Sequence, residues 1–153
     1  MGKVILTYGT FDLFHVGHLN ILSRLRALGD RLVVGVSTDE FNATKGKKTF
    51  IPYADRTAIV SSLRCVDEVF AEQTWDQKPA DIARFGASVL GMGGDWEGRF
   101  DDLRELCEVV YLSRTEAISS SHLKRMLNVL NQSHVHDLKE ALDMISAVVS
   151  QFE

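Results

Sequence analysis

The stretch KVILTYGTFDLFHVGHLNIL, residues 3–22, joins an apolar strand pattern, a glycine turn and the start of a helical pattern. Residues 3–9 form a short run that is rich in apolar side chains, as is typical of a strand that is buried on both faces. From residue 17 to residue 28 the apolar side chains follow helical spacing. A strand that passes directly into a helix predicts the first unit of a parallel sheet.

The same alternation of strand and helix continues along the chain. Strand patterns recur at 31–37, 67–72, 87–93 and 107–113, and helical spacing recurs at 53–64, 78–85, 99–105 and from about Ser119. We therefore predict an α/β fold, a Rossmann-like parallel five-stranded sheet with helices on both faces, plus an extra C-terminal helix. The polar segment NQSH at 131–134 predicts a break. It divides the chain into a main domain, residues 1–130, and a C-terminal helical extension, residues 131–153.

Composition excludes several classes of partner. The net charge of −4 over 153 residues gives no basic field that would attract nucleic acid. No apolar run approaches the ~20 residues that span a bilayer, and the first residues lack a secretory signal pattern. Cys65 and Cys107 are far apart, and we interpret them as reduced, buried thiols. We expect a cytoplasmic protein with no nucleic-acid partner and no membrane insertion.

Two histidines stand where the first strand has ended and the first helix begins. In open parallel sheets, ligands bind at the carboxyl ends of the strands. His15 and His18 flank Gly17 at such a place, and Gly9 allows a close backbone approach. A phosphate there would accept hydrogen bonds from backbone N–H groups and from both imidazoles. A metal site is the alternative, but no third ligand stands nearby, and the glycines do not form a dinucleotide fingerprint.

Further polar clusters follow three other predicted strands. ATKGKK, residues 43–48, places Lys45, Lys47 and Lys48 around a glycine after the second strand. MGGDWEG, residues 92–98, follows the fourth strand, and SRTEAISSSHL, residues 113–123, follows the fifth. The last stretch combines Arg114 with hydroxyl side chains at a helix start, which is a second pattern for anion binding. Four clusters at one sheet edge predict a site of triphosphate size.

Four of these segments together resemble a known enzyme family. GTFDLFHVGH (9–18), KGKK (45–48), GDWEG (94–98) and RTEAISSS (114–121) are similar to the bacterial glycerol-3-phosphate cytidylyltransferases of the HxGH nucleotidyltransferase superfamily. The likeness runs from about Lys3 to Met126. The chain departs from the family pattern at Gly94, where the family has an aspartate, and at Ala117, where it has a glycine. The loss of one carboxylate at Gly94 leaves the identity of the acceptor open.

The resemblance implies cytidylyl transfer from CTP to sn-glycerol 3-phosphate, giving CDP-glycerol and pyrophosphate by direct in-line attack. It assigns catalysis to His15, His18, Lys45 and Arg114. It places the acceptor beside Lys45, Lys78, Arg56 and Trp75. Besides the histidines and Arg114, it assigns nucleotide binding to Gly9, Thr10, Phe11, Asp12, Gly17, Lys47, Asp95, Thr115, Ile118, Ser119, Ser120 and Ser121. Among these we expect Asp12 to orient either its loop or the Arg114 side of the site, and not to act as an acid or base.

The resemblance also implies Mg²⁺ carried by the CTP phosphates, a homodimer, and a role in making teichoic-acid or capsule precursors. No carboxylate cluster indicates a metal held by the protein itself. The residues leave open another phosphorylated alcohol, such as phosphoethanolamine, or adenylyl transfer, since Trp75 and Trp96 could cage a cationic alcohol. A non-catalytic nucleotide-binding module explains the combined histidines, lysines and arginine less well.

The tail carries a pattern of its own that the family does not explain. Six apolar side chains recur at heptad spacing: Val135, Leu138, Leu142, Ile145, Val149 and Phe152. Such a seam has to be covered, either by the protein's own domain or by a partner subunit. We favour the partner subunit, in line with the implied homodimer.

Overall fold

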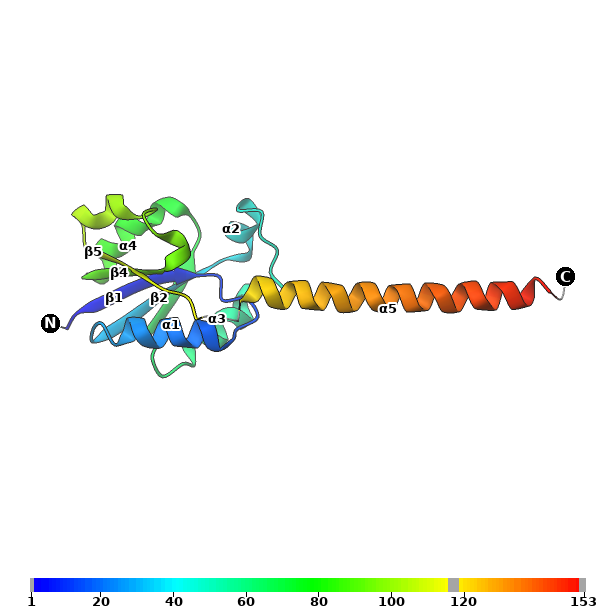
Figure 1. The fold of residues 1–153 in the computed structure, drawn as a ribbon. Coiled ribbons are helices and arrows are strands. Elements are labelled where there is room, and N and C mark those ends of the chain that lie inside the picture. Colours follow the sequence, from blue (N-terminus) through cyan, green and yellow to red (C-terminus); the bar gives the residue numbers. More distant parts are fainter. Residues whose placement is uncertain (1, 116–118, 152–153) are drawn as a thin grey trace. The chain divides into compact units, whose positions relative to one another are not determined.

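The computed structural model describes residues 2–115 and 119–151. Its first 118 residues contain one five-stranded parallel sheet in the order β3-β2-β1-β4-β5 (Figure 1). The strands are β1 (Val4–Gly9), β2 (Arg31–Ser37), β3 (Glu68–Glu72), β4 (Val89–Gly93) and β5 (Glu108–Leu112). The predicted fold class is confirmed. The order reverses between β1 and β4, and this switch point is where a ligand is expected beyond the carboxyl ends of the strands.

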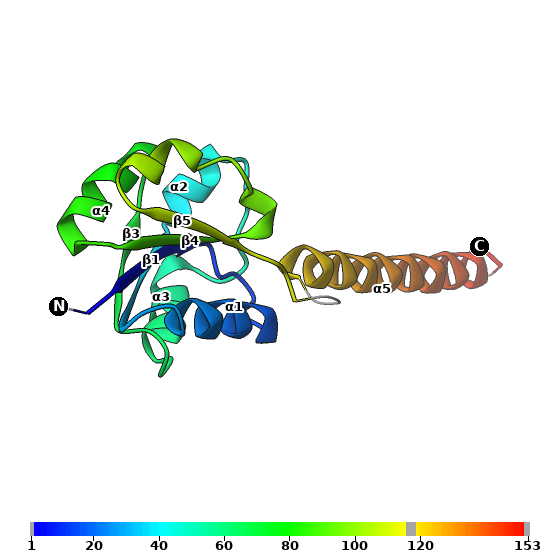
Figure 2. The same ribbon diagram turned by 60° about the vertical axis from the view of Figure 1, so that its left-hand side comes forward.

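Helices cover both faces of the sheet (Figure 2). α1 (Val16–Arg26) and α3 (Tyr53–Ser61) lie on one face, and α4 (Lys78–Phe85) lies on the other. Successive side chains of a strand point to opposite faces. Ile5 accordingly belongs to the apolar cluster beneath α1 and α3, and Leu6 belongs to the cluster beneath α4. Both side chains are fully buried, so β1 anchors the two halves of the core.

Two short segments differ from what the sequence predicted. Residues 39–44 form the helix α2 (Asp39–Thr44), which was not predicted, and the Thr38 hydroxyl caps it by accepting from Phe41 N at 3.1 Å. The expected helix over 99–105 is a 3₁₀ helix, η3 (Asp101–Glu105). It is enclosed by Gly98, at a φ of 81°, and by β5, and such short connecting segments are where 3₁₀ turns are frequent.

The chain forms two compact units, Met1–Ile118 and Ser119–Glu153. The second contains α5 (Ser120–Val149), one helix of 30 residues. α5 runs through 131–134 without interruption, so the predicted break is wrong. Those residues include neither glycine nor proline, and their helix propensities differ from that of alanine by at most about 0.7 kcal/mol each. Phe152 of the predicted seam lies outside the described residues.

Cys65 and Cys107 are free thiols, each half-buried at the margin of one apolar cluster, so the prediction that they are buried holds only in part. Within the described part of the chain, no helix is both long and apolar enough to cross a membrane.

Candidate active site

The segment of residues 10–18, which we call the histidine turn, joins β1 to α1. His15 is the N-cap of α1, and its Nδ1 accepts a hydrogen bond from Gly17 N at 3.0 Å. His18 Nδ1 in turn accepts from His15 N at 3.2 Å, so the two side chains form a capping box. A ring nitrogen that accepts a hydrogen bond carries no proton. Each neutral imidazole therefore bears its proton on Nε2.

The surroundings of the two rings keep both of them neutral. The ring centroids are 3.9 Å apart in a stacked arrangement. Burial, followed by the proximity of His15, lowers the pKa of His18 to about 4. Burial and the nearby Arg114 guanidinium lower the pKa of His15. Among the described residues, His15 Nε2 is a buried side-chain nitrogen without a hydrogen-bond partner. A phosphate oxygen is the kind of group that would complete it.

The backbone of the histidine turn is held in a strained form. Phe11 has a φ of 55° and Leu13 a φ of 47°, both in the left-handed region that is costly for these residue types. The buried carboxylate of Asp12 accepts hydrogen bonds from Leu13 N at 3.1 Å, Phe50 N at 2.9 Å and Ile51 N at 3.0 Å. Asp12 thus holds the turn against residues 50–51, which corresponds to the first of the two structural roles considered for it.

Gly9 and Thr10 have structural partners at the end of β1. A Cβ atom on Gly9 would lie 2.8 Å from the ring of Phe11, so the packing of that ring already requires a glycine. The Thr10 hydroxyl donates to Asn42 Oδ1 at 3.0 Å and links the histidine turn to α2. Asn42 was not predicted, and nothing in its sequence position indicates this contact.

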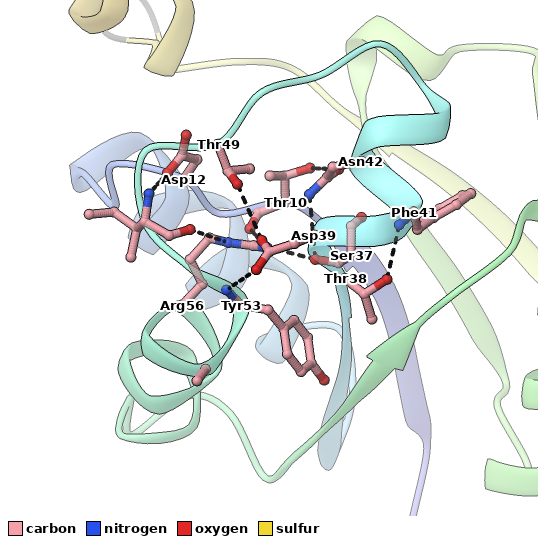
Figure 3. Close-up of polar contacts among 12 residues, drawn as sticks. Thr10, Asp12, Ser37, Thr38, Asp39, Phe41, Asn42, Thr49, Tyr53 and Arg56 are labelled. Atoms are coloured by element: carbon pink, nitrogen blue, oxygen red, sulfur yellow. Dashed lines mark hydrogen bonds and ion pairs between the residues drawn. The ribbon is translucent and has the colours of Figure 1, made fainter.

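Arg56 joins several segments below the site (Figure 3). Its side chain is fully buried and donates to the carbonyl oxygens of Thr10 at 2.7 Å, Ser37 at 2.8 Å and Ile51 at 2.9 Å. It also pairs with Asp39 at 2.7 Å. Arg56, predicted beside the acceptor, thus has protein groups as its partners in this structure, and its assignment to the acceptor stays a prediction. In sequence, an arginine in the first turn of a helix looks the same whether it faces the solvent or the interior.

Beside the histidine turn lies a set of residues that we call the lysine cluster: Ser37, Lys45, Glu72, Trp75 and Lys78. Lys45 Nζ donates to Ser37 Oγ at 3.2 Å, and Ser37 Oγ donates to Glu72 Oε2 at 2.5 Å. Lys78 Nζ donates to Glu72 Oε1 at 2.8 Å. The ring centroid of Trp75 lies 5.2 Å from Lys45 Nζ and 4.9 Å from Lys78 Nζ. The structure thus brings together Lys45, Lys78 and Trp75, all three predicted beside the acceptor.

A cavity of about 500 Å³ opens next to the lysine cluster. Its wall combines aromatic, cationic and acidic side chains: Trp75, Asp76, Lys78, Pro79, Trp96, Arg99, Phe100, Asp102 and Leu103. The rings of Trp75 and Trp96 have centroids 5.5 Å apart, and Lys47 Nζ lies 5.8 Å from the Trp96 ring. A cavity of this size, with aromatic walls and charged groups that can orient a ligand, can hold a small charged molecule.

The charge of Arg114 lowers the pKa of His15, which indicates that the guanidinium lies close to the histidine turn. Its guanidinium pairs with Asp95 at 2.6 Å, and both side chains are more than half exposed. The structure thereby joins two residues predicted to bind the nucleotide. At Gly94, a Cβ atom would lie 3.3 Å from Leu112 O, so the aspartate of the family pattern would need a small shift of the neighbouring backbone.

Two residues of α1 that were not predicted as site residues form hydrogen bonds to the segment around Arg114. Asn20 Nδ2 donates to Thr115 Oγ1 at 3.2 Å, and Arg24 donates to Ser113 O at 2.7 Å. The Thr115 hydroxyl, which we predicted to bind the nucleotide, therefore already has one partner. The position of Asn20, two residues after His18, is the one signal that could have identified it.

The predicted serines lie in the second unit. Ser119 is the N-cap of α5, and its hydroxyl accepts from His122 N at 3.1 Å. Ser120 and Ser121 form the first turn of that helix, and Ile118 lies outside the described residues. In the described part of the chain, no group of three His, Cys, Asp or Glu side chains could hold a metal ion.

The chain matches the family model described as cytidylyltransferase-like over residues 6–147. It is 52% identical over 122 residues to the glycerol-3-phosphate cytidylyltransferase of Bacillus subtilis (strain 168), a match that covers 80% of this chain and 95% of the relative. The chain belongs to the glycerol-3-phosphate cytidylyltransferase family. The predicted family and its nucleotidyltransferase class are confirmed.

Other matches agree with this family. The glycerol-3-phosphate cytidylyltransferase of Staphylococcus aureus (strain NCTC 8325 / PS 47) is 49% identical over 125 residues, which cover 82% of this chain and 95% of the relative. Among solved structures, a lipopolysaccharide core biosynthesis protein from Thermoplasma volcanium GSS1 superposes with a TM-score of 0.69. That match covers 76% of this chain and 100% of the other at 23% identity, so it supports the fold of the cytidylyltransferase domain alone.

Proposed function

We propose that this enzyme transfers the cytidylyl group of CTP to sn-glycerol 3-phosphate, forming CDP-glycerol and releasing pyrophosphate. The observation that carries the proposal is the pair of neutral imidazoles at the start of α1, each with its Nδ1 used by the backbone. Their Nε2–H groups are fixed donors for phosphate oxygens. Relatives of about 50% identity bear the name of this reaction.

In the proposed reaction, an oxygen of the acceptor phosphate attacks the α-phosphorus of CTP. The bond from the α-phosphorus to the bridging oxygen of the pyrophosphate breaks in line with the attack. Because the attacking oxygen is already anionic, no general base is needed, and catalysis consists of positioning and charge stabilisation. His15 and His18 donate hydrogen bonds to the developing charge, and Arg114 holds the β- and γ-phosphates.

The approach of two anions needs positive charge between them. We assign the cavity of about 500 Å³ to the acceptor and call it the acceptor cavity; Lys78 and Trp75 form part of its wall. Lys45 and Lys47 supply the positive charge at its edge. Mg²⁺ enters as part of the nucleotide substrate, bound to the CTP phosphates. We place the enzyme in the cytoplasm, where CTP is made, and its product among teichoic-acid or capsule precursors.

An assay of pyrophosphate release with a panel of substrates tests the proposal. We expect turnover with CTP and sn-glycerol 3-phosphate, and much slower release when ATP replaces CTP or phosphoethanolamine replaces the acceptor. Faster release with either substitute would overturn the proposed substrates. No release with any pair would overturn the enzymatic function itself.

We infer that the enzyme is a homodimer to which α5 contributes. Val135, Leu138, Leu142, Ile145 and Val149 repeat at heptad spacing, and each is more than half exposed. An a/d seam of this kind is complementary to a second copy of itself under twofold symmetry. A second copy of the chain is therefore the partner that we assign to this face of the helix.

Two substitutions in the full-length chain test the role of α5. Leu138→Glu combined with Ile145→Glu places charges in the seam, whereas Met144→Glu places a charge on an exposed residue outside it. We expect the first variant to sediment at a lower mass and to keep its turnover per site, and the second to behave as wild type. Equal sedimentation of all three proteins at low concentration would contradict this role.

A further inference from the structure

The proposed mechanism leaves one buried carboxylate of the lysine cluster without a function. Glu72 is the last residue of β3 and is 3% exposed. Its two oxygens have different partners, because Oε1 accepts from Lys78 Nζ at 2.8 Å and Oε2 accepts from Ser37 Oγ at 2.5 Å. With both oxygens bonded, the carboxylate is fixed in orientation.

The Ser37 hydroxyl connects this carboxylate to Lys45. Ser37 is the last residue of β2, pairs with Glu72 in the sheet register and is 1% exposed. Its Oγ donates to Glu72 and accepts from Lys45 Nζ at 3.2 Å. The same ammonium group lies 4.1 Å from the ring centroid of Phe41, which limits its movement on the other side. Lys45 is therefore placed by contacts that originate at the ends of two neighbouring strands.

We propose that Glu72 is a positioning residue: through Ser37 it holds the Lys45 ammonium at the phosphate-binding edge, and through its other oxygen it holds Lys78 in the wall of the acceptor cavity. The inference rests on the proposed function, in which Lys45 neutralises the meeting phosphates. Glu72 itself touches neither substrate. It acts through the two lysines.

The charges around Lys45 explain why such a carboxylate is needed. Burial lowers the pKa of Lys45 to about 8, and the nearby cations Lys47, Lys78 and Arg56 lower it as well. Glu72 is the carboxylate that raises it. Without the charge of Glu72, Lys45 releases its proton at lower pH, and a neutral amine no longer compensates the charge of two phosphates.

Glu72→Gln tests the proposal with little change of shape. The amide can still accept from Lys78 and donate to Ser37, but its charge is gone. Glu68→Gln is the matched control, because it removes a carboxylate from the other end of β3, where Glu68 pairs with Arg31. For Glu72→Gln we expect the alkaline limb of the kcat/KM profile for glycerol 3-phosphate to move down by about one pH unit. For Glu68→Gln we expect it to stay in place.

Lys45→Arg tests whether titration of Lys45 causes the alkaline limb, because a guanidinium does not titrate in this range. The limb should be absent in Lys45→Arg and in Lys45→Arg combined with Glu72→Gln. A second measurement needs no catalysis: the pKa of Lys45 is followed by NMR after ¹³C-methylation of the lysines. It should be lower in Glu72→Gln, and also in Ser37→Ala, than in wild type.

An unchanged Lys45 pKa in Glu72→Gln would overturn the positioning role, whatever the activity. Conversely, wild-type protein that transfers no cytidylyl group would overturn the proposed function, while the NMR titration would still decide whether Glu72 acts on Lys45.

Discussion

The histidine turn and the lysine cluster lie at the same edge of the sheet but present their hydrogen-bond donors in different ways. In the turn, the backbone fixes two neutral rings, because His15 and His18 each use one nitrogen to cap α1. In the cluster, side chains fix two cations, because Lys45 and Lys78 share the carboxylate of Glu72 through direct and hydroxyl-mediated contacts. A neutral donor needs only a cap, whereas a buried cation needs a counter-charge.

This difference predicts how each region responds to substitution. Replacement of a histidine by another capping residue removes a donor and leaves the helix start intact. Replacement of one charged partner in the lysine cluster leaves an uncompensated charge in the interior. We therefore expect the free energy of unfolding to fall together with substrate binding. The following variants are chosen to separate these two responses.

The largest effect is expected in the histidine turn. His15→Asn retains a strong N-cap residue, and His18→Gln retains a residue suited to the capping box. Each variant should lose at least about a hundredfold in kcat, the scale found when one donor to the transition state is removed. Steady-state kinetics and thermal unfolding, measured together, would show lost turnover with little change in Tm. Near-normal turnover in either variant would remove that ring from the mechanism.

Arg114 comes next in expected size. Arg114→Lys keeps the charge but loses the forked geometry that suits phosphate, so we expect the KM for CTP to rise by about tenfold. The KM for glycerol 3-phosphate should change less. Arg104→Lys, in an exposed pair with Asp101, is the control for arginine replacement in general. An equal rise in both KM values would argue against a division of the pocket between nucleotide and acceptor.

Lys78→Met should have a smaller effect on kinetics and a clear effect on stability. We expect the KM for glycerol 3-phosphate to rise more than the KM for CTP, because Lys78 lines the acceptor cavity. Breaking its buried pair with Glu72 should cost about 3–5 kcal/mol of unfolding free energy. Adding Glu72→Gln removes the stranded charge and should restore part of the stability but not the KM. Recovery of both would mean that Lys78 acts through stability alone.

The smallest effect concerns acid stability. The unfolded chain protonates His18 near its ordinary pKa of 6.5, but the folded chain does so only near a pKa of about 4. Between these values the unfolded state binds more protons, so the free energy of unfolding falls as the pH falls. His18→Gln lacks this contribution and should lose less stability across the same window. Urea denaturation at a series of pH values compares the two slopes, and parallel slopes would contradict the depressed pKa.

The fold could be predicted because its signals are local. Each strand is a short apolar run that ends in turn residues, and the helix over 78–85 was expected with the bounds that α4 has. The histidine turn was located for the same reason, since a strand end and a helix start are both visible in the sequence. α2 was missed because six residues hold too few apolar positions to show a period.

The parts that could not be predicted depend on contacts between distant segments. Nothing in the sequence distinguishes a buried Arg56 from an exposed one, because its partners lie 5 to 46 residues away along the chain. Glu72 carried one usable signal, a carboxylate at the end of a strand that faces the site edge. The capping by the two histidines is a backbone contact, and residue types alone do not reveal which ring nitrogen it uses.

The guanidinium of Arg56 also has a consequence for the order in which the molecule assembles. It links the ends of β1 and β2 to the segment before α3, and because Arg56 belongs to α3, these links form only when α3 packs against the sheet. In the same region, the amide protons of Phe50 and Ile51 bond to Asp12 and that of Tyr53 bonds to Asp39. These three amides should therefore exchange with solvent deuterium as one group. During refolding, the time at which they become protected should report when these contacts form.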